Sequence, residues 1–230
     1  MTNAAARIFM VIPAYNEAEV IAQTLQKALS TGHEIVLVDD CSTDDTALIA
    51  SQFPVHLLQH LVNLGQGAAL QTGMDYVRKR GGEVLVHFDA DGQHRLEDLD
   101  QMLAPVLAGE ADVVLGSRFM NAEFARSVPR ARSILLKGAK LIDGLLTGLW
   151  LSDVHNGYRV LGKKAIDCIQ LKSNGMAHAS EIKLEIKRHK LRWQEVAVQI
   201  EYSDYSRAKG QSPLNAVHIL LDLISRKILP

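Results

Sequence analysis

Two carboxylates separated by one residue follow an apolar run in the middle of the sequence. Residues 84–88 read Val-Leu-Val-His-Phe, and Asp89, Ala90 and Asp91 come next. Residues i and i+2 of a strand share a face, so Asp89 and Asp91 can converge on one point. Two such carboxylates repel unless a cation lies between them or one takes up a proton. The segment therefore predicts a site for Mg²⁺ or Mn²⁺ with substrate phosphates; the alternative is a polar strand end that caps the next helix.

Polar residues follow other apolar runs in the same way. The runs 8–13, 34–38 and 111–116 have the composition of buried strands. The polar residues after them are Tyr15, Asn16, Asp39, Asp40 and Arg118. Strands that alternate with helical segments predict an α/β fold with a mainly parallel central sheet covered by helices on both faces. Ligands of such sheets bind beyond the carboxyl ends of the strands, so we expect the site at that edge.

Local signals predict how the intervening helices begin. Asn16 is expected to cap the first helix, with Glu19 completing a capping box. Ser42 and Asp45 are expected to open a second helix over residues 43–52, and alternation over 193–202 predicts a strand.

Composition favours one domain and a reducing compartment. The 230 residues are 47% hydrophobic, which supports a sizeable core. We expect a single domain over residues 1–230. Cys41 and Cys168 lie far apart without metal-ligand spacing, so neither a disulfide framework nor a zinc site is indicated. No signal peptide is recognisable at the N-terminus, and a cytoplasmic location is expected.

Charge is distributed unevenly along the chain. Residues 1–125 hold 7 Lys and Arg against 17 Asp and Glu, a balance of −10, whereas residues 126–230 hold 18 against 9, a balance of +9. An acidic half fits a cation-dependent site and a basic half fits an anionic partner. Basic residues are not interleaved with aromatic ones, so nucleic acid is not an expected partner. Alternatively, the uneven charge arises by chance and from ordinary solvent-exposed helix faces. We interpret Lys183, Lys187, Arg188 and Lys190 as one such solvated face.

The C-terminal segment 213–229 is amphipathic and too short to span a bilayer. It either packs on the domain or lies on a surface. With the basic charge of this half, we expect peripheral binding at the inner face of the membrane, or to a small membrane protein.

Several motifs resemble family 2 glycosyltransferases, and among them the dolichyl- or polyprenyl-phosphate mannosyl- and glucosyltransferases. They are residues 11–17 (Val-Ile-Pro-Ala-Tyr-Asn-Glu), 38–44 (Val-Asp-Asp-Cys-Ser-Thr-Asp), 63–70 (Asn-Leu-Gly-Gln-Gly-Ala-Ala-Leu), 89–94 (Asp-Ala-Asp-Gly-Gln-His), 116–118 (Gly-Ser-Arg) and 153–159 (Asp-Val-His-Asn-Gly-Tyr-Arg). The resemblance implies a GT-A fold, an inverting mechanism, a divalent cation and a nucleotide diphosphate-sugar donor.

The resemblance also implies that residues 1–120 bind the donor and residues 121–230 bind the acceptor, and it implies roles for individual residues. The donor would be held by Pro13, Tyr15, Asn16, Glu17, Asp39, Asp40 and Asp89. The metal would be held by Asp89, Asp91 and Gln93, and catalysis would involve Asp91, Asp153 and Arg118. Candidate ligands of an acceptor phosphate are Arg118, Arg130, Arg159, Arg207 and Ser212.

The identity of the acceptor stays open on the sequence. Gln66 replaces the usual Lys of the Gly-Lys-Gly turn, Pro213 stands where a Lys is common, and no transmembrane pair follows residue 230. A polyprenyl phosphate acceptor is preferred, and it is already a nucleophile at neutral pH. If the acceptor is instead a sugar hydroxyl of a polysaccharide or lipid-linked glycan, Asp153 would be the base that takes its proton.

Other classes fit less well. The Gly65-Gln66-Gly67 turn lacks the third glycine of a dinucleotide-binding loop and follows the wrong strand. A sugar-phosphate nucleotidyltransferase would need a Gly-rich basic loop after the first strand. A non-catalytic membrane-associated subunit stays open as the lowest-ranked reading. His87, His94, His155 and His178 are interpreted as core or loop residues rather than ligands.

Overall fold

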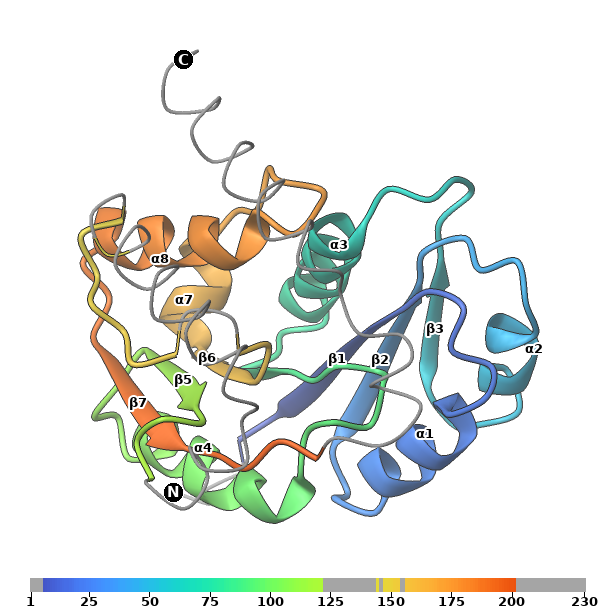
Figure 1. Cartoon of the computed structure of the whole chain (residues 1–230), viewed down its shortest axis with the longest axis horizontal. Coiled ribbons are helices and arrows are strands. Elements are labelled where there is room, and N and C mark those ends of the chain that lie inside the picture. The colour runs from blue at the N-terminus through green and yellow to red at the C-terminus, as the bar shows by residue number, and fades with distance from the viewer. Residues whose placement is uncertain (1–5, 122–143, 145–146, 154–155, 202–230) are drawn as a thin grey trace.

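A seven-stranded sheet runs through the part of the chain that the structure describes, a computed structural model covering residues 6–121, 144, 147–153 and 156–201 (Figure 1). In chain order its strands are β1 (Ile8–Ala14), β2 (Glu34–Asp39), β3 (His56–Gln59), β4 (Val84–His87), β5 (Val113–Ser117), β6 (Arg159–Gly162) and β7 (Trp193–Ala197).

The order across the sheet is β3-β2-β1-β4-β6-β5-β7. All neighbouring pairs are parallel except those of β6, which runs antiparallel to both β4 and β5. The prediction of a mainly parallel sheet is confirmed. Because β6 comes from the second half of the sequence and lies between two strands of the first half, both halves contribute to the same edge of one sheet.

Helices cover both faces, as predicted. One face is covered by α1 (Ile21–Leu29), α2 (Thr46–Ala50) and α4 (Leu99–Leu107), which follows the short helix η1 (Leu96–Asp98). The other face is covered by α3 (Gln66–Lys79), α7 (Lys163–Cys168) and α8 (His178–Arg188). None of the helices in the described ranges is long and apolar enough to cross a membrane.

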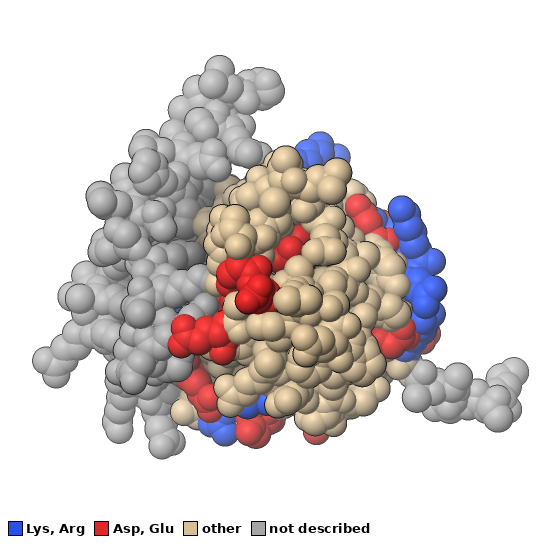
Figure 2. All heavy atoms as spheres, turned by 90° about the vertical axis from the view of Figure 1, so that its right-hand side faces the viewer, with Lys and Arg blue, Asp and Glu red and all other residues tan. Residues whose placement is uncertain are grey.

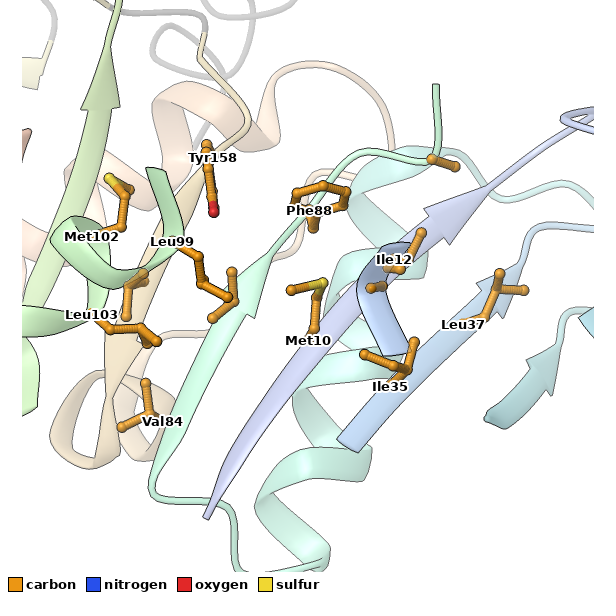
Figure 3. Close-up of a cluster of buried hydrophobic side chains, with 14 of the residues drawn as sticks. Met10, Ile12, Ile35, Leu37, Val84, Phe88, Leu99, Met102, Leu103 and Tyr158 are labelled. Atoms are coloured by element: carbon orange, nitrogen blue, oxygen red, sulfur yellow. The ribbon is translucent and has the colours of Figure 1, made fainter. Parts of the chain in front are cut away.

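The central strand β1 supplies both layers of the core. Met10 and Ile12 belong to the cluster that includes residues of α1 and α4 on one face, and Figure 3 shows them near Phe88 and Ile35. Phe9 and Val11 point to the other face and pack with residues of α3, α7 and α8. Each such fully buried side chain contributes about 1.5–3 kcal/mol relative to an exposed one. This two-sided core holds the strand ends rigidly at their carboxyl edge.

The predicted helix start at Asn16 is wrong, since α1 begins at Ile21. Asn16 adopts a left-handed backbone (φ 53°), and its Oδ1 accepts a hydrogen bond of 2.8 Å from the Thr43 backbone N–H. Its own N–H donates to the Ser42 Oγ at 2.9 Å. The asparagine therefore joins the loops after β1 and β2 instead of capping a helix.

Two other boundaries also differ from the expected ones. Helix α2 begins at Thr46, whose N–H donates to the Asp44 Oδ1 at 3.0 Å, so Asp44 takes the part expected of Ser42 and Asp45. The last strand ends at Ala197 rather than at residue 202, because the ladder with β5 stops there.

The beginning of α3 is locked to the loop that precedes α8. The N–H groups of Gly67 and Ala68 donate to the Asn174 carbonyl at 2.7 and 3.2 Å, which supplies an acceptor for amides that an isolated helix leaves unpaired. A Cβ on Gly67 would lie 1.9 Å from the Ser173 carbonyl oxygen. Only glycine allows this approach.

We expect Gly67→Ala to destabilise the protein by about 2 kcal/mol or more, because the backbone of residues 173–175 must move away. The change in the free energy of unfolding is measured by urea denaturation. Gly175→Ala is the matched control: its Cβ would meet nothing within 4 Å and its φ is not positive, so a change below about 0.5 kcal/mol is expected. Equal losses for the two variants would contradict this account of the interlock.

Candidate active site

The polar residues predicted at the strand ends do lie along one edge of the sheet. The parallel strands β1, β2, β4 and β5 end there, at Ala14, Asp39, His87 and Ser117. Strand β6 is antiparallel and begins at this edge with Arg159, so the polar segment before it, including Asp153, reaches the same place. Of the predicted site residues, Arg130, Arg207 and Ser212 lie outside the described residues, as does the amphipathic tail.

Asp89 is held by two side chains that the sequence did not assign to it. Its Oδ2 lies 2.9 Å from the His94 Nε2, and its Oδ1 accepts a hydrogen bond of 3.2 Å from the Gln66 Nε2. The buried His94 ring packs against the rings of Phe88 and Tyr158. This packing fixes the imidazole, and the imidazole fixes the carboxylate. The only sequence signal was the spacing of His94 five residues after Asp89.

The two carboxylates at the end of β4 have opposite pKa shifts. Burial alone would raise the pKa of Asp89, but the charge and hydrogen bond of His94, with smaller effects of Arg159 and His178, lower that pKa to about 2. Burial and the charge of Asp89 raise the pKa of Asp91 to about 6. The two carboxylates therefore lie close enough for the charge of Asp89 to disfavour the ionisation of Asp91.

The donor set around this pair fits a hard divalent cation only in part. Within the ranges described, no group of three or more His, Cys, Asp or Glu side chains could hold a metal ion. Gln93 contacts Asp91 through its Nε2, at 2.7 Å, and through its backbone N–H, at 3.0 Å, so its amide nitrogen rather than its oxygen faces the carboxylate. Two repelling carboxylates with substrate oxygens still make the kind of set that Mg²⁺ or Mn²⁺ accepts.

Asp39 presents a buried oxygen without a partner. Its side chain is buried, and its Oδ2 accepts a hydrogen bond of 3.3 Å from the Ser42 N–H. Its Oδ1 has no hydrogen-bond partner. A buried, unpaired carboxylate oxygen is costly and rare, which marks a place where a ligand can donate a hydrogen bond. Tyr15, in the loop after β1, is 43% exposed, whereas Pro13 is buried within β1, paired with Val38.

Asp40 forms its contacts with other residues of the protein. Its oxygens accept from the backbone N–H groups of Leu64 and Gly65, at 2.9 and 2.6 Å, and contact the His60 Nδ1 at 2.7 Å. Asp40 therefore anchors the loop between β3 and α3. Contact with a donor molecule, expected from the sequence, stays a prediction for this residue. Glu17 is likewise buried, and its backbone N–H donates to the Thr46 Oγ1 at 2.8 Å.

Arg118 and Asp153, predicted as separate catalytic groups, form a buried ion pair with each other. The Arg118 Nε and Nη2 donate to the two oxygens of Asp153 at 2.6 and 2.7 Å, and the Arg118 backbone N–H adds a third contact of 3.1 Å. Both side chains are almost fully buried. The fork geometry holds the carboxylate with both oxygens occupied.

A layer of buried basic side chains lies beneath this edge, on the face covered by α3 and α8. Burial lowers the pKa of Arg159 to about 10, and burial together with the charge of Arg159 lowers the pKa of His178 to about 4. Burial also lowers the pKa of His87, whose two ring nitrogens have no hydrogen-bond partner. The interpretation of these two histidines as core residues agrees with their burial.

The expectation of a solvated face is wrong for Lys183, which is only 2% exposed, and correct for Lys187, Arg188 and Lys190. Lys183 follows the buried Ile182 and precedes the buried Ile186 by three positions, so it lies on the packed side of α8. Its helical spacing from Ala179 and Ile186 could have revealed this from the sequence.

Acidic side chains gather in the middle of the molecular face seen in Figure 2, and basic ones lie toward its margins. That face is the right-hand side of Figure 1, where α1, α2 and β3 lie. The elements on this face, α1, α2 and β3, come from the acidic N-terminal half of the sequence.

Comparison with known proteins gives concordant results. Residues 9–170 match the family model described as glycosyl transferase family 2. The chain is 28% identical over 241 residues to the UDP-N-acetylglucosamine–dolichyl-phosphate N-acetylglucosaminyltransferase of Methanococcus voltae, covering 96% of each protein. It is 31% identical over 219 residues to the undecaprenyl-phosphate mannosyltransferase of Micrococcus luteus, covering 91% of this chain and 88% of that one.

A solved structure shares the fold. The glucosyl-3-phosphoglycerate synthase of Mycobacterium tuberculosis, in complex with Mn²⁺, uridine diphosphate and glucosyl-3-phosphoglycerate, superposes with a TM-score of 0.69 at 19% identity, covering 98% of this chain and 81% of that one. The predicted GT-A fold is confirmed, and so is the resemblance to the prenyl-phosphate branch. The chain belongs to glycosyl transferase family 2 and is a glycosyltransferase.

Proposed function

We propose that the protein transfers a hexose, with inversion, from a nucleotide diphosphate-sugar to polyprenyl phosphate in a metal-dependent reaction at the inner face of the membrane. The observation that carries the proposal is the unequal carboxylate pair Asp89 and Asp91, held at a sheet edge that also presents an unpaired oxygen of Asp39. The dolichyl- and undecaprenyl-phosphate transferases among its relatives support the acceptor class.

The nucleoside of the donor would lie over the ends of β1 and β2. The free Oδ1 of Asp39 can accept a hydrogen bond from a base or ribose, and the exposed Tyr15 ring can contact the base. The backbone N–H of Asn16 donates to Ser42 in the loop after β2, and that of Glu17 donates to Thr46 at the start of α2, which keeps this surface in place.

Asp89 and Asp91 would hold the divalent cation, with Gln93 reaching it if its amide rotates. A cation bound there would offset the charge of the diphosphate and stabilise the departing nucleotide. The Mn²⁺ and uridine diphosphate present in the Mycobacterium tuberculosis structure support this assignment in general. His94 and Gln66 would keep Asp89 oriented, since both contact it directly.

The Arg118–Asp153 pair favours a phosphate acceptor over a sugar hydroxyl. A hydroxyl must lose its proton to a base, and a carboxylate whose two oxygens both accept from a guanidinium is poorly placed to take it. A phosphate monoester is already a nucleophile and needs positioning alone. Transfer to a glycan hydroxyl stays the second candidate and would require Asp153 to leave Arg118.

The proposal is tested with a panel of nucleotide sugars and Mn²⁺ or Mg²⁺, assayed with polyprenyl phosphate and, separately, with sugar acceptors. Product formation on polyprenyl phosphate is the expected result. Transfer to sugar hydroxyls alone would favour the second candidate. The absence of both transfer and donor hydrolysis over the whole panel would instead point to a non-catalytic membrane-associated subunit.

Asp91→Asn is expected to lower transfer by at least about a hundredfold, because the cation loses a charged ligand. The same variant should be more stable than wild type in chelator near pH 8, by about 1–2 kcal/mol after allowance for partial exposure. The pKa of Asp91 is higher in the folded state, so its ionisation lowers stability as the pH rises from about 4 to about 6.

This stability difference should therefore vanish near pH 4, where Asp91 is protonated in wild type as well. Urea unfolding at the two pH values measures it. A variant that is less stable than wild type near pH 8 would show that repulsion between Asp89 and Asp91 does not lower the free energy of unfolding.

Mn²⁺ affinity should fall as the pH is lowered through about 6, because protons compete for Asp91. Titration of Mn²⁺ followed by electron paramagnetic resonance measures the affinity at each pH. Asp75→Asn is the matched control, since that carboxylate pairs with Arg78 within α3, and it should keep the wild-type profile. An affinity that is flat between about pH 5 and pH 7 would refute the assignment of Asp91 as a ligand.

A further inference from the structure

A small pocket lies between the edge of the sheet and α8, next to Asp153. It has room for about a single water-sized atom, and its mouth is partly open. Its lining residues belong to β5, β6, α8 and the segment before β6. The polar ones are Asp153, Asn156, Arg159 and Lys183, and the rest of the wall is apolar or glycine.

Asn156 lines this pocket and carries an unpaired hydrogen-bond donor. The side chain is 7% exposed, and its Oδ1 accepts a hydrogen bond of 3.0 Å from the Tyr158 backbone N–H. That bond fixes which end of the amide faces away. The Nδ2 group is buried and has no hydrogen-bond partner.

Arg159 adds a second unpaired donor. It is the first residue of β6, lies between His87 of β4 and Leu115 of β5, and is 4% exposed. Its Nη1 has no hydrogen-bond partner. Burial lowers its pKa only to about 10, so the guanidinium stays charged at neutral pH. Native proteins rarely leave such groups unsatisfied, which indicates that something binds here.

The chemistry of the lining selects an anionic oxygen. Asn156 and Arg159 offer donors, and the buried Lys183 adds positive charge. The carboxylate of Asp153 is already bound at both oxygens by Arg118. A hydroxyl placed here would have to donate its own hydrogen to that occupied group, whereas an anionic oxygen needs only donors.

We propose that this Asn156–Arg159 pocket is an oxyanion subsite that receives one oxygen of the acceptor's phosphate. The inference rests on the proposed function and deepens it, because it assigns acceptor binding to two residues and leaves Arg118 as the residue that positions Asp153. The phosphate could belong to a prenyl lipid or to a small phosphorylated acceptor. The shared chemistry is a phosphate monoester oxygen entering a donor-only pocket.

The test variant is Asn156→Asp in the full chain. Aspartate keeps the oxygen that accepts from the Tyr158 N–H and replaces the unpaired donor by a second oxygen, which repels an anion. Asn174→Asp is the matched control, because it introduces the same charge on an exposed side chain. Asn156→Ala removes the donor without adding charge, so it separates the loss of the hydrogen bond from the effect of the added negative charge.

The first readout needs no turnover. Inorganic phosphate should raise the melting temperature of wild type and of Asn174→Asp, and it should not raise that of Asn156→Asp. Equal stabilisation of all three proteins would overturn the proposal. This measurement tests whether the pocket binds phosphate even if the wild-type enzyme transfers no sugar to a phosphate acceptor. Failure of the pocket proposal can therefore be distinguished from failure of the proposed function.

The second readout is kinetic. For Asn156→Asp we expect the KM for polyprenyl phosphate to rise about tenfold or more, and that for Asn156→Ala to rise less, with the KM for the nucleotide sugar unchanged. A small phosphorylated acceptor assayed in parallel distinguishes the two sources of phosphate. A rise in the donor KM with an unchanged acceptor KM would place the sugar donor in the pocket and refute the assignment.

Discussion

The repulsion between Asp89 and Asp91 is the constraint around which the described structure is arranged. The two carboxylates follow β4, a strand that the core fixes from both faces, so the backbone that carries them has little freedom to separate them. The fold does not neutralise the pair equally. It gives Asp89 a histidine partner and leaves Asp91 with a raised pKa, so the unfavourable charge is concentrated on the side chain that a cation would relieve.

Other charges at this edge are compensated in pairs. Arg118 holds Asp153 with a fork of two hydrogen bonds, and Asp40 is satisfied by backbone amides and His60. The buried polar atoms that have no hydrogen-bond partner therefore indicate where a ligand can bind. Within the described residues it includes an oxygen of Asp39, a nitrogen of Asn156 and a nitrogen of Arg159. An acceptor atom lies at the end of β2, where a nucleoside can donate, and two donor atoms lie by β6, where an anion can accept.

Loops from distant parts of the chain keep these groups in place. The asparagine after β1 joins the β2 loop, and the start of α3 is bonded to the loop before α8. Gln66 lies at the start of α3 and contacts Asp89. This contact links the helix that follows β3 to the carboxylate that follows β4.

Much of the framework could be read from residue order. Apolar runs that end in carboxylates predicted the parallel strands, and motif spacing predicted the family and the strand-end residues, because both depend on local pattern. Three features needed the tertiary structure. The capping role expected of Asn16 was replaced by a contact with Thr43, a residue whose proximity depends on β1 and β2 pairing.

The pairing of Arg118 with Asp153 follows from the antiparallel insertion of β6 between β4 and β5, a strand too short for its sequence to specify its neighbours. The burial of Lys183 follows from the packing of α8 on the sheet. The sequence by itself determined which chemical groups reach the sheet edge. The packing of β6 and α8 decided which of them neutralise one another and which are left for a ligand, because charge compensation depends on distances of a few ångströms between residues far apart in the chain.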